Sequence, residues 1–276
     1  MSEDNAAAPV IITGMHRSGT TMLSGLLSDI GVCMGWSRAN SEAVFFHKLN
    51  LAIERAINAS WDNPENYTWF NACPEKKKEI IGWLKKKVGG PGSCLYYSRF
   101  GLFPSKQLTS IKGPWGWKDP RNTFTFDLWR DVFPGAKVIH VVRNAVDVAA
   151  SLRQREINVP PPLFGPYSSF RVCDLGGGFS LWKAYVAKGR SIVPDNGEGD
   201  IMHLRYEDFL EAPTPVLRNI AAFCGTPVED ETLKRMTKKL DKSRSYSFMS
   251  DKELRGFYEK IKNDPLMAEL GYSGLT

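Results

Sequence analysis

The chain has 276 residues, of which 42% are hydrophobic and 24% are charged. This is ordinary for a folded globular protein, and the length suits one α/β domain with an inserted substrate region rather than a disordered or fibrous chain. The net charge of +6 favours anionic ligands, such as a nucleotide or an acidic acceptor, and is equally compatible with a weak membrane or nucleic-acid contact.

The sequence carries no sign of secretion or of a membrane span. The first residues include Glu3 and Asp4 and lack the basic and apolar stretches of a secretory signal. No run approaches the roughly 20 apolar residues that cross a bilayer. The five cysteines are odd in number and widely spread, so neither a disulfide framework nor a zinc site is indicated. We expect a cytoplasmic protein.

A strand, a turn and a helix are predicted over residues 10–30. Val10–Ile12 is a short β-branched run, and the leucines that follow the turn recur at helical spacing. Gly14 and Gly19 allow the intervening backbone to fold tightly. The first N–H groups of the helix and the positive end of its dipole then face the turn. The turn is therefore a predicted anion site.

The spacing of this turn fits a P-loop with one departure. Gly14-x-x-x-x-Gly19 is followed by two threonines, but Thr20 stands where a nucleotide triphosphatase has its lysine. That lysine neutralises the β- and γ-phosphates, so its absence favours a donor without a γ-phosphate, or no catalysis here at all. Arg17 supplies the positive charge of the loop instead.

Residues 16–21, His-Arg-Ser-Gly-Thr-Thr, resemble the loop by which sulfotransferases bind 3′-phosphoadenosine 5′-phosphosulfate (PAPS). Family loops usually begin with proline and a basic residue; here His16 replaces the proline, and Arg17 matches the basic position. The resemblance implies that the loop binds PAPS and its product, adenosine 3′,5′-bisphosphate (PAP), without a metal ion. It also gives Arg17 a catalytic role at the leaving phosphate. The implied cofactor ligands are Gly14, His16, Arg17, Ser18, Gly19, Thr20 and Thr21.

A second helix is predicted over Asn40–Glu54, entered through polar residues. In the bacterial and carbohydrate-type sulfotransferases that the chain resembles, this segment runs from asparagine through aromatic residues to a glutamate, and His47 stands near that position. The resemblance offers Glu42 and His47 as general bases, with His16 as a third candidate. His47 follows two phenylalanines, so simple packing is the alternative.

Residues 36–112 are predicted to contain an inserted cap that binds the acceptor, because segments between scaffold elements carry specificity. A lysine-rich helix is expected over Pro74–Val88, as a solvated face or as a phosphate- or glycan-binding patch. The tract Lys118-Asp119-Pro120-Arg121 then resembles one that the family carries after a strand. By that resemblance Lys118 steadies the bridging oxygen as sulfate leaves, and Arg121 holds an acidic group. A surface turn with a local ion pair is the alternative.

A buried strand is predicted at Lys137–Val142, an almost continuous apolar run. Asn144-x-x-Asp147 is typical of a capping box that opens a helix, and both side chains are expected to face the carboxyl edge of the sheet, away from the core. Arg143 and Ser151, eight residues apart, resemble the pair with which sulfotransferases hold the 3′-phosphate of PAPS. A guanidinium and a hydroxyl suit a dianionic phosphate. A structural ion pair of Arg143 is the alternative.

Three later segments have alternative interpretations. The prolines of residues 160–166 and Gly176–Gly178 fit a lid and its hinge, or merely a long connection before a helix. Tyr206 lies in an Arg-Tyr-Glu-Asp tract that the family often carries after a strand, which implies a place at the cofactor. The basic segment 238–255 is expected to be a solvated tail, the alternative being that Arg244 substitutes for a nucleotide-covering loop.

Together these patterns predict one α/β domain over residues 1–276, with a central parallel sheet flanked by helices in a P-loop-like, three-layer architecture. The resemblance covers residues 10–57 and 115–225. It implies sulfuryl transfer from PAPS to a hydroxyl or amine of a small-molecule, lipid or glycan acceptor, with no nucleic-acid partner. The alternatives are a P-loop kinase, which Thr20 argues against, and a non-catalytic protein that binds a nucleotide or nucleic acid.

Overall fold

The computed structural model describes residues 8–38, 40–98, 108, 111–160, 168–193, 200–238 and 240–275. The strands are β1 Val10–Gly14, β2 Gly116–Lys118, β3 Lys137–Val142 and β4 Ile201–Arg205. The α-helices are α1 Thr20–Asp29, α2 Val44–Ala56, α3 Asn66–Asn71, α4 Pro74–Val88, α5 Asn122–Val132, α6 Ala145–Ile157, α7 Leu175–Arg190, α8 Tyr206–Glu211, α9 Pro213–Phe223, α10 Asp230–Thr237, α11 Lys252–Ile261 and α12 Pro265–Glu269. The 3₁₀ helices are η1 Pro91–Tyr96, η4 Arg171–Cys173, η6 Lys242–Arg244 and η7 Ser247–Ser250.

Four parallel strands form one sheet in the order β2-β1-β3-β4. β1 lies between β2 and β3, with Val10 opposite Gly116 on one side and Lys137 on the other. The strands that follow β1 in the sequence thus lie on both sides of it, β2 on one side and β3 on the other. In such a sheet, ligands bind in the crevice at the carboxyl ends of the central strands. The predicted central parallel sheet is confirmed.

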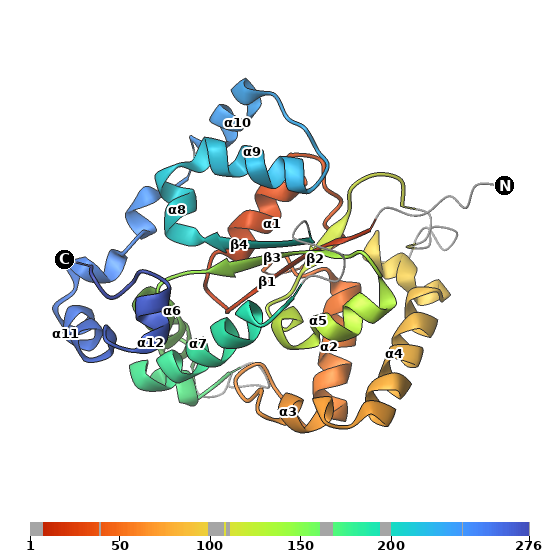
Figure 1. Ribbon diagram of the computed structural model, residues 1–276, viewed down its shortest axis with the longest axis horizontal. Helices are drawn as coiled ribbons and strands as arrows, with labels where there is room; N and C mark the ends of the chain where they lie inside the picture. The colour runs from red at the N-terminus through yellow and green to blue at the C-terminus, as the bar shows by residue number, and fades with distance from the viewer. Residues whose placement is uncertain are drawn as a thin grey trace.

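Helices cover both faces of the sheet, which gives three layers (Figure 1). Side chains of β1 alternate between these faces: Val10 and Ile12 pack with α1 and α9, whereas Ile11 packs with α2, α4 and α5. This alternation follows from the two-residue period of a strand. Because both faces of β1 and β3 are covered, their near-continuous apolar sequences are explained.

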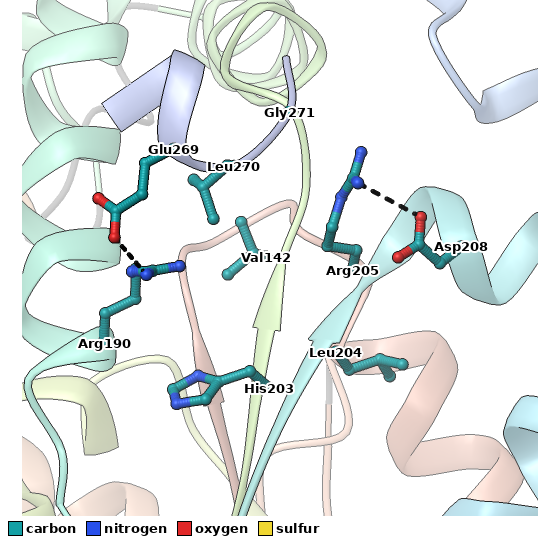
Figure 2. Close-up of a pocket in the computed structure, with 9 residues that line it drawn as sticks. All are labelled: Val142, Arg190, His203, Leu204, Arg205, Asp208, Glu269, Leu270 and Gly271. Atoms are coloured by element: carbon teal, nitrogen blue, oxygen red, sulfur yellow. Dashed lines mark hydrogen bonds and ion pairs between the residues drawn. The ribbon is translucent and has the colours of Figure 1, made fainter. Parts of the chain in front are cut away.

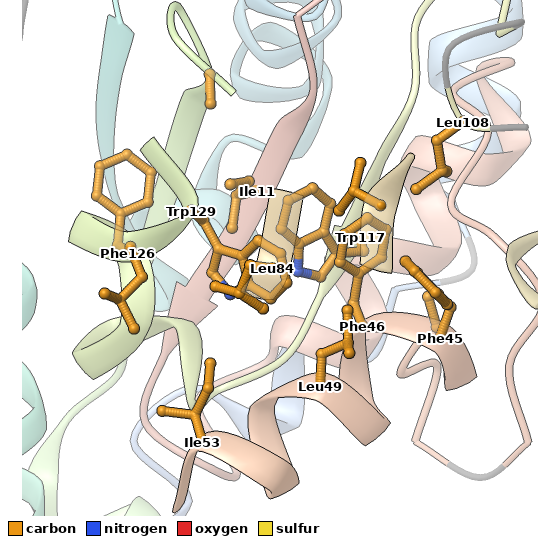
Figure 3. Close-up of a cluster of buried hydrophobic side chains, with 14 of the residues drawn as sticks. Ile11, Phe45, Phe46, Leu49, Ile53, Leu84, Leu108, Trp117, Phe126 and Trp129 are labelled. Carbon is orange, nitrogen blue, oxygen red and sulfur yellow. The ribbon is translucent and has the colours of Figure 1, made fainter. Parts of the chain in front are cut away.

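The core on the α2 side is rich in aromatic rings (Figure 3). Phe46 of α2 stacks flat on Trp117 of β2, with ring centroids 3.7 Å apart, and meets Trp129 of α5 edge to face. Leu49 and Ile53 of α2 join the same cluster. Residues 36–112 thus contribute α2 and α4 to the layer that covers one face of the sheet. Their role in binding an acceptor stays a prediction.

The start of α2 differs from the prediction. Asn40 and Ser41 have positive φ angles of 61° and 56°, which interrupt a right-handed helix, so α2 begins at Val44 rather than at Asn40. Glu42 consequently lies in the turn before the helix and not on it. Its carboxylate is placed by that turn.

Gly176–Gly178 form neither the hinge nor the long connection that the sequence left open, because these glycines lie in the first turn of α7. A Cβ atom at Gly178 would come within 3.0 Å of the Ala149 side chain, and one at Gly177 within 2.0 Å of the Arg171 carbonyl oxygen. Glycine therefore allows close packing of α7 against α6 and η4. The alternative also placed a lid at the prolines of residues 160–166. Three of these, Pro161, Pro162 and Pro166, lie outside the described residues.

The segment 238–255 is solvated over most of its described length, as expected, but it is not a free tail. The segment after α10 folds against α6, and Phe248, Tyr258 and Tyr272 are buried in one cluster with apolar residues of α6 and α7. The Asp147 carboxylate accepts hydrogen bonds from the Ser247 hydroxyl, at 2.8 Å, and from the Phe248 N–H, at 2.9 Å. The predicted outward orientation of Asp147 is therefore wrong: this side chain is buried and ties the C-terminal segment to α6.

Asn144 is buried beside it. Its side chain caps α6 by accepting a hydrogen bond from the Asp147 N–H, as the capping box predicts, and its amide group donates to Glu207. The expected outward orientation of Asn144 is wrong for the same reason, since Glu207 follows β4 and closes over it. Within the part of the chain that the structure describes, no helix is both long and apolar enough to cross a lipid bilayer.

Candidate functional site

The turn between β1 and α1 wraps the N-terminus of α1, as the sequence predicts. Gly14 has a φ of +133°, and a Cβ atom there would lie 2.3 Å from a carbonyl oxygen of β3, so the position requires glycine. The Ser18 hydroxyl donates to the Met15 carbonyl at 2.6 Å and closes the turn from within. Gly19, with a φ of +98°, immediately precedes the first residue of α1.

A cavity of about 390 Å³ opens at this helix N-terminus. We call it the loop cavity. It brings together most of the predicted site residues: His16, Arg17, Gly19, Thr20, Thr21, Glu42, Lys118, Arg143 and Tyr206. Gly14 and Ser18 shape the turn but do not line the cavity, and Ser151 reaches it through Arg17. The lining also includes Arg244, which the sequence offered only as an alternative, and Arg155, which it missed.

The loop and α6 are joined through Arg17. Its guanidinium Nε donates a hydrogen bond to the Ser151 hydroxyl at 2.9 Å, across 134 residues of sequence. Arg143 donates to the Arg17 carbonyl oxygen at 3.3 Å and to the Arg244 carbonyl oxygen at 2.7 Å. Two separate motifs and the C-terminal segment therefore meet at one place.

Arg143 makes the structural ion pair that was its alternative role, at 3.1 Å from the Asp147 carboxylate. It also lines the loop cavity, and its guanidinium lies 4.8 Å from the centroid of the Tyr206 ring. Among the described residues, its buried Nε has no hydrogen-bond partner. The pair with Asp147 thus orients a guanidinium that retains capacity to bind an anion.

Positive charge dominates the loop cavity. Four arginines, at positions 17, 143, 155 and 244, line it together with Lys118. Burial, followed by the charges of the three other arginines, lowers the pKa of Arg17 from its ordinary value. Neighbouring cations at a helix N-terminus favour an anion, because both the side chains and the helix dipole present positive charge. The cavity is therefore a candidate phosphate site.

The tract from Lys118 to Arg121 is buried, so its interpretation as a surface turn is wrong. Lys118 is 1% exposed and its Nζ lies 3.1 Å from the Glu42 carboxylate. Asp119 accepts hydrogen bonds from His47 Nδ1, at 3.2 Å, and from the Asn50 amide, at 3.1 Å. The tract therefore contacts both leading candidates for a general base: Lys118 pairs with Glu42, and Asp119 hydrogen-bonds His47.

Arg121 connects this tract to Glu54 of α2. Its guanidinium lies 2.9 Å from the Glu54 carboxylate and 3.3 Å from that of Asp119. Burial raises the pKa of Glu54 to about 7, although Arg121 opposes the shift. Burial also acts to raise the pKa of Asp119, but the charge of Arg121 and the hydrogen bond from His47 outweigh it and lower that pKa below its ordinary value. Asp119 thus stays ionised and fixes the His47 ring.

A second cavity, of about 460 Å³, lies beside α2, and we call it the α2 cavity. It shares His16, Asn40, Glu42 and Arg155 with the loop cavity, so the two hollows adjoin. Glu42 thus lies where they meet, 3.5 Å from His47 Nδ1, whereas His47 lines only the α2 cavity. A carboxylate at this junction can take a proton from a hydroxyl that approaches from the α2 side.

His16 also lies at the junction. Its ring packs edge to face on Trp61, with centroids 4.9 Å apart, and burial lowers its pKa well below the ordinary value. Its Nε2 is buried and has no hydrogen-bond partner among the described residues. The His16 ring therefore forms part of the wall where the two cavities adjoin.

The sequence analysis missed Arg155 and Trp61. Arg155 lies four residues after Ser151 on α6, so helical spacing places both on one face of α6, and this signal was available. Trp61 carried none. It is buried, and the Arg155 guanidinium lies 4.7 Å from its ring centroid.

A third cavity, of about 420 Å³, lies between β4, the end of α7 and α12 (Figure 2). It contains no predicted site residue. Arg190 pairs with Glu269, and Arg205 lies 3.6 Å from Asp208, so each cation here has a carboxylate partner (Figure 2). The Nδ1 atom of His203 lies within hydrogen-bond distance of the Nδ1 atom of His140, at 3.1 Å.

Comparison with known proteins finds relatives over most of the chain. An uncharacterized protein of Aquifex aeolicus (strain VF5) is 27% identical over 225 residues, which are 82% of this chain and 26% of that protein. The chain therefore spans about a quarter of the length of this relative.

Solved structures of similar fold include the sulfotransferase STF1 of Mycobacterium tuberculosis H37Rv, at 14% identity and a TM-score of 0.48, covering 98% of this chain and 78% of that one. Another is the mouse sulfotransferase SULT7A1 complexed with PAP, at 14% identity and a TM-score of 0.45, covering 96% and 89%. A model of the sulfotransferase family matches residues 9–230, and the chain therefore belongs to the sulfotransferase family.

Proposed function

We propose that the protein transfers a sulfuryl group from PAPS to a hydroxyl or amine of a small-molecule, lipid or glycan acceptor, and that it does so in the cytoplasm. One observation carries the proposal: Arg17, from the loop after β1, and Arg143, from the end of β3, line one cavity at the N-terminus of α1. A nucleotide with phosphates at both its 5′ and 3′ positions needs two such cationic places.

The residues of the loop cavity fit a bisphosphate. The α1 N-terminus, Thr20 and Thr21 suit the 5′ phosphosulfate, since backbone N–H groups and the helix dipole stabilise an anion there. Arg143 and Ser151 suit the 3′ phosphate, and the buried, unpartnered Nε of Arg143 is the observation that favours an absent anion. Arg17 lies between the two groups through its hydrogen bond to Ser151.

When bound, PAPS supplies an activated sulfuryl group, and PAP is left after transfer. Arg17 and the loop N–H groups stabilise the negative charge that grows on the leaving phosphate, a contribution on the order of a hundredfold or more in rate for one donor. Lys118, buried and held by Glu42, keeps a cation close to that charge.

Glu42 acts as the general base in this proposal. Its carboxylate lies where the two cavities meet, and it accepts the proton of the acceptor hydroxyl as that oxygen forms its bond to sulfur. His47 positions Glu42 from the α2 side, because the Asp119 carboxylate fixes the His47 ring.

Thermal unfolding with PAP, and separately with ATP and Mg²⁺, tests the donor site. PAP at about 100 times its dissociation constant adds about 2.7 kcal/mol to the free energy of unfolding, which shifts Tm by several degrees. The shift disappears in Arg143→Ala. It is reduced in Arg143→Lys, which keeps the positive charge but loses the paired N–H donors of the guanidinium. It persists in Arg153→Ala, which removes a partly buried arginine of α6 that pairs with Glu253 and does not line the loop cavity. A shift with ATP and Mg²⁺ but none with PAP would overturn the proposal in favour of a kinase.

A further inference from the structure

One face of α2 forms a wall of the α2 cavity. Val44, His47, Lys48 and Leu51 line it, at positions i, i+3, i+4 and i+7 of the helix. This spacing is that of a single helical stripe. Val44 and Leu51 make its two ends apolar, and His47 and Lys48 make its middle polar. Any acceptor that reaches Glu42 from this side must pass along the stripe.

Most charges in the α2 cavity are balanced by neighbours. Arg121 pairs with Glu54 and Asp119, and the Arg155 Nε donates to Glu156 at 2.6 Å. The Glu42 carboxylate is in turn balanced by Lys118. These pairs leave little charge to attract a ligand.

Arg38 and Lys48 are different. Both side chains line the cavity and are exposed, and within the described ranges neither forms an ion pair with a carboxylate. The Arg38 guanidinium lies 5.6 Å from the centroid of the Trp36 ring. Two uncompensated cations therefore stand in a cavity whose other charges cancel, next to the apolar Val44 and Leu51.

We propose that the α2 cavity selects an acceptor that carries an anionic group beside an apolar portion, and that Arg38 and Lys48 are the residues that select it. The inference rests on the proposed sulfotransferase function. An anionic group between the two cations places the rest of the molecule along Val44 and Leu51. A hydroxyl of that molecule then lies toward Glu42, at the junction with the loop cavity.

Two predictions distinguish a selecting role from a structural one. Exposed cations contribute modestly to the binding of an anion, so the two together give about a tenfold preference for the anionic acceptor over its neutral counterpart. The preference weakens as salt rises from about 0.05 M to 0.5 M, because exposed charges are screened. Apolar contacts with Val44 and Leu51 are not weakened in this way.

The experiment uses octyl β-D-glucuronide and octyl β-D-glucoside, which differ only at C6, where a carboxylate in the first replaces the hydroxymethyl group of the second. Calorimetry measures the binding of each, below its micellar concentration, to the full chain saturated with PAP. PAP release from PAPS then measures turnover. The variants are the wild type, the double substitution Arg38→Gln with Lys48→Gln, and Arg55→Gln. Arg55 is exposed one turn beyond Leu51 on the same helix and does not line the cavity, so it is the matched control.

We expect the wild type and Arg55→Gln to bind the glucuronide about ten times more tightly than the glucoside, and the double variant to bind both equally. Equal binding by the wild type, no binding of the glucuronide, or an unchanged preference in the double variant would overturn the inference. Saturation with PAP is verified first, and a protein that does not bind PAP contradicts the proposed function instead. The two failures are therefore distinguishable.

Discussion

The Nε of Arg17 donates a hydrogen bond to the hydroxyl of Ser151, 2.9 Å away, and thereby joins the turn after β1 to the second turn of α6. The φ of Arg17 is +69°, an uncommon value for a residue other than glycine. The bond fixes the direction of a guanidinium that lines the loop cavity. The residue proposed to hold one phosphate is thus positioned by the residue proposed to hold the other.

Replacing Ser151 with alanine removes this acceptor and one ligand of the 3′ phosphate. A hydrogen bond to a charged group contributes about 1.5–3 kcal/mol, so the dissociation constant of PAP should rise by about tenfold or more. Calorimetry with PAP measures it. Ser191→Ala, which removes a hydroxyl bonded to the Lys188 carbonyl at the end of α7, should leave PAP binding unchanged. Equal affinity in Ser151→Ala and the wild type would remove Ser151 from the site.

Gly19→Ala should damage the loop cavity. The φ of Gly19 is +98°, and an added Cβ atom would lie 2.4 Å from the Tyr206 ring, so either the turn or the ring must move. We expect a loss of about 1–3 kcal/mol in the free energy of unfolding, with weaker PAP binding.

The matched control is Gly25→Ala, in the same helix. A Cβ atom at Gly25 meets nothing within 4 Å, so this change should stabilise α1 by about 0.5–1 kcal/mol and leave PAP binding intact. Urea unfolding compares the two variants. Similar stability of Gly19→Ala and the wild type would mean that the turn is not constrained as described.

Glu42→Gln and His47→Gln separate the proposed base from its positioning neighbour. Loss of a general base lowers kcat by about two to four powers of ten, so Glu42→Gln should fall in that range while PAP affinity is kept. His47→Gln should lose less activity, because it only disturbs the placement of Glu42. Initial rates measured with saturating PAPS compare the kcat values of the two variants. The opposite order of effects would make His47 the base.

Glu54 should make the stability of the protein depend on pH. Its folded-state pKa of about 7 lies above the ordinary 4.5, so between these values the folded chain binds a proton more readily than the unfolded chain. Its contribution to the free energy of unfolding is therefore complete below about pH 4.5 and decreases by about 3 kcal/mol as the pH rises through 7.

Urea unfolding between pH 5 and 8 measures this contribution. The stability of the wild type relative to Glu54→Gln, which cannot titrate, should fall as the pH rises. The exposed substitution Glu231→Gln provides a baseline in which the difference from the wild type stays flat. A flat difference for Glu54→Gln as well would contradict the raised pKa.

The elements nearest the loop cavity could be predicted because their signals are local. The buried β-branched run before Gly14 gives β1, and the apolar run at Lys137–Val142 gives β3 with the predicted bounds. The lysine-rich helix has its predicted bounds, Pro74–Val88, because proline and glycine delimit it. Arg143 and Ser151 were singled out because their identity and spacing resemble those of the sulfotransferase pair.

The remaining features depend on contacts between distant segments. Nothing local in Gly176–Gly178 shows that Ala149 and the Arg171 carbonyl press against these glycines, so a helix start resembles a flexible loop. The polar segment after residue 238 reads as a solvated tail until Asp147 provides partners for its N–H groups. The hydrogen bond between Arg17 and Ser151 likewise exists only once β1 and β3 are neighbours.

The C-terminal segment that docks on Asp147 lies beyond the family match but contributes to the loop cavity. The family match ends at residue 230, yet the carbonyl that receives the Arg143 guanidinium belongs to Arg244. A protein cut at residue 230 would keep both phosphate motifs and lose a wall of the cavity that they line. It would also leave the Asp147 carboxylate without the hydroxyl and N–H groups that satisfy it. The segment after residue 230 lies outside the family match and nevertheless completes the wall of the loop cavity.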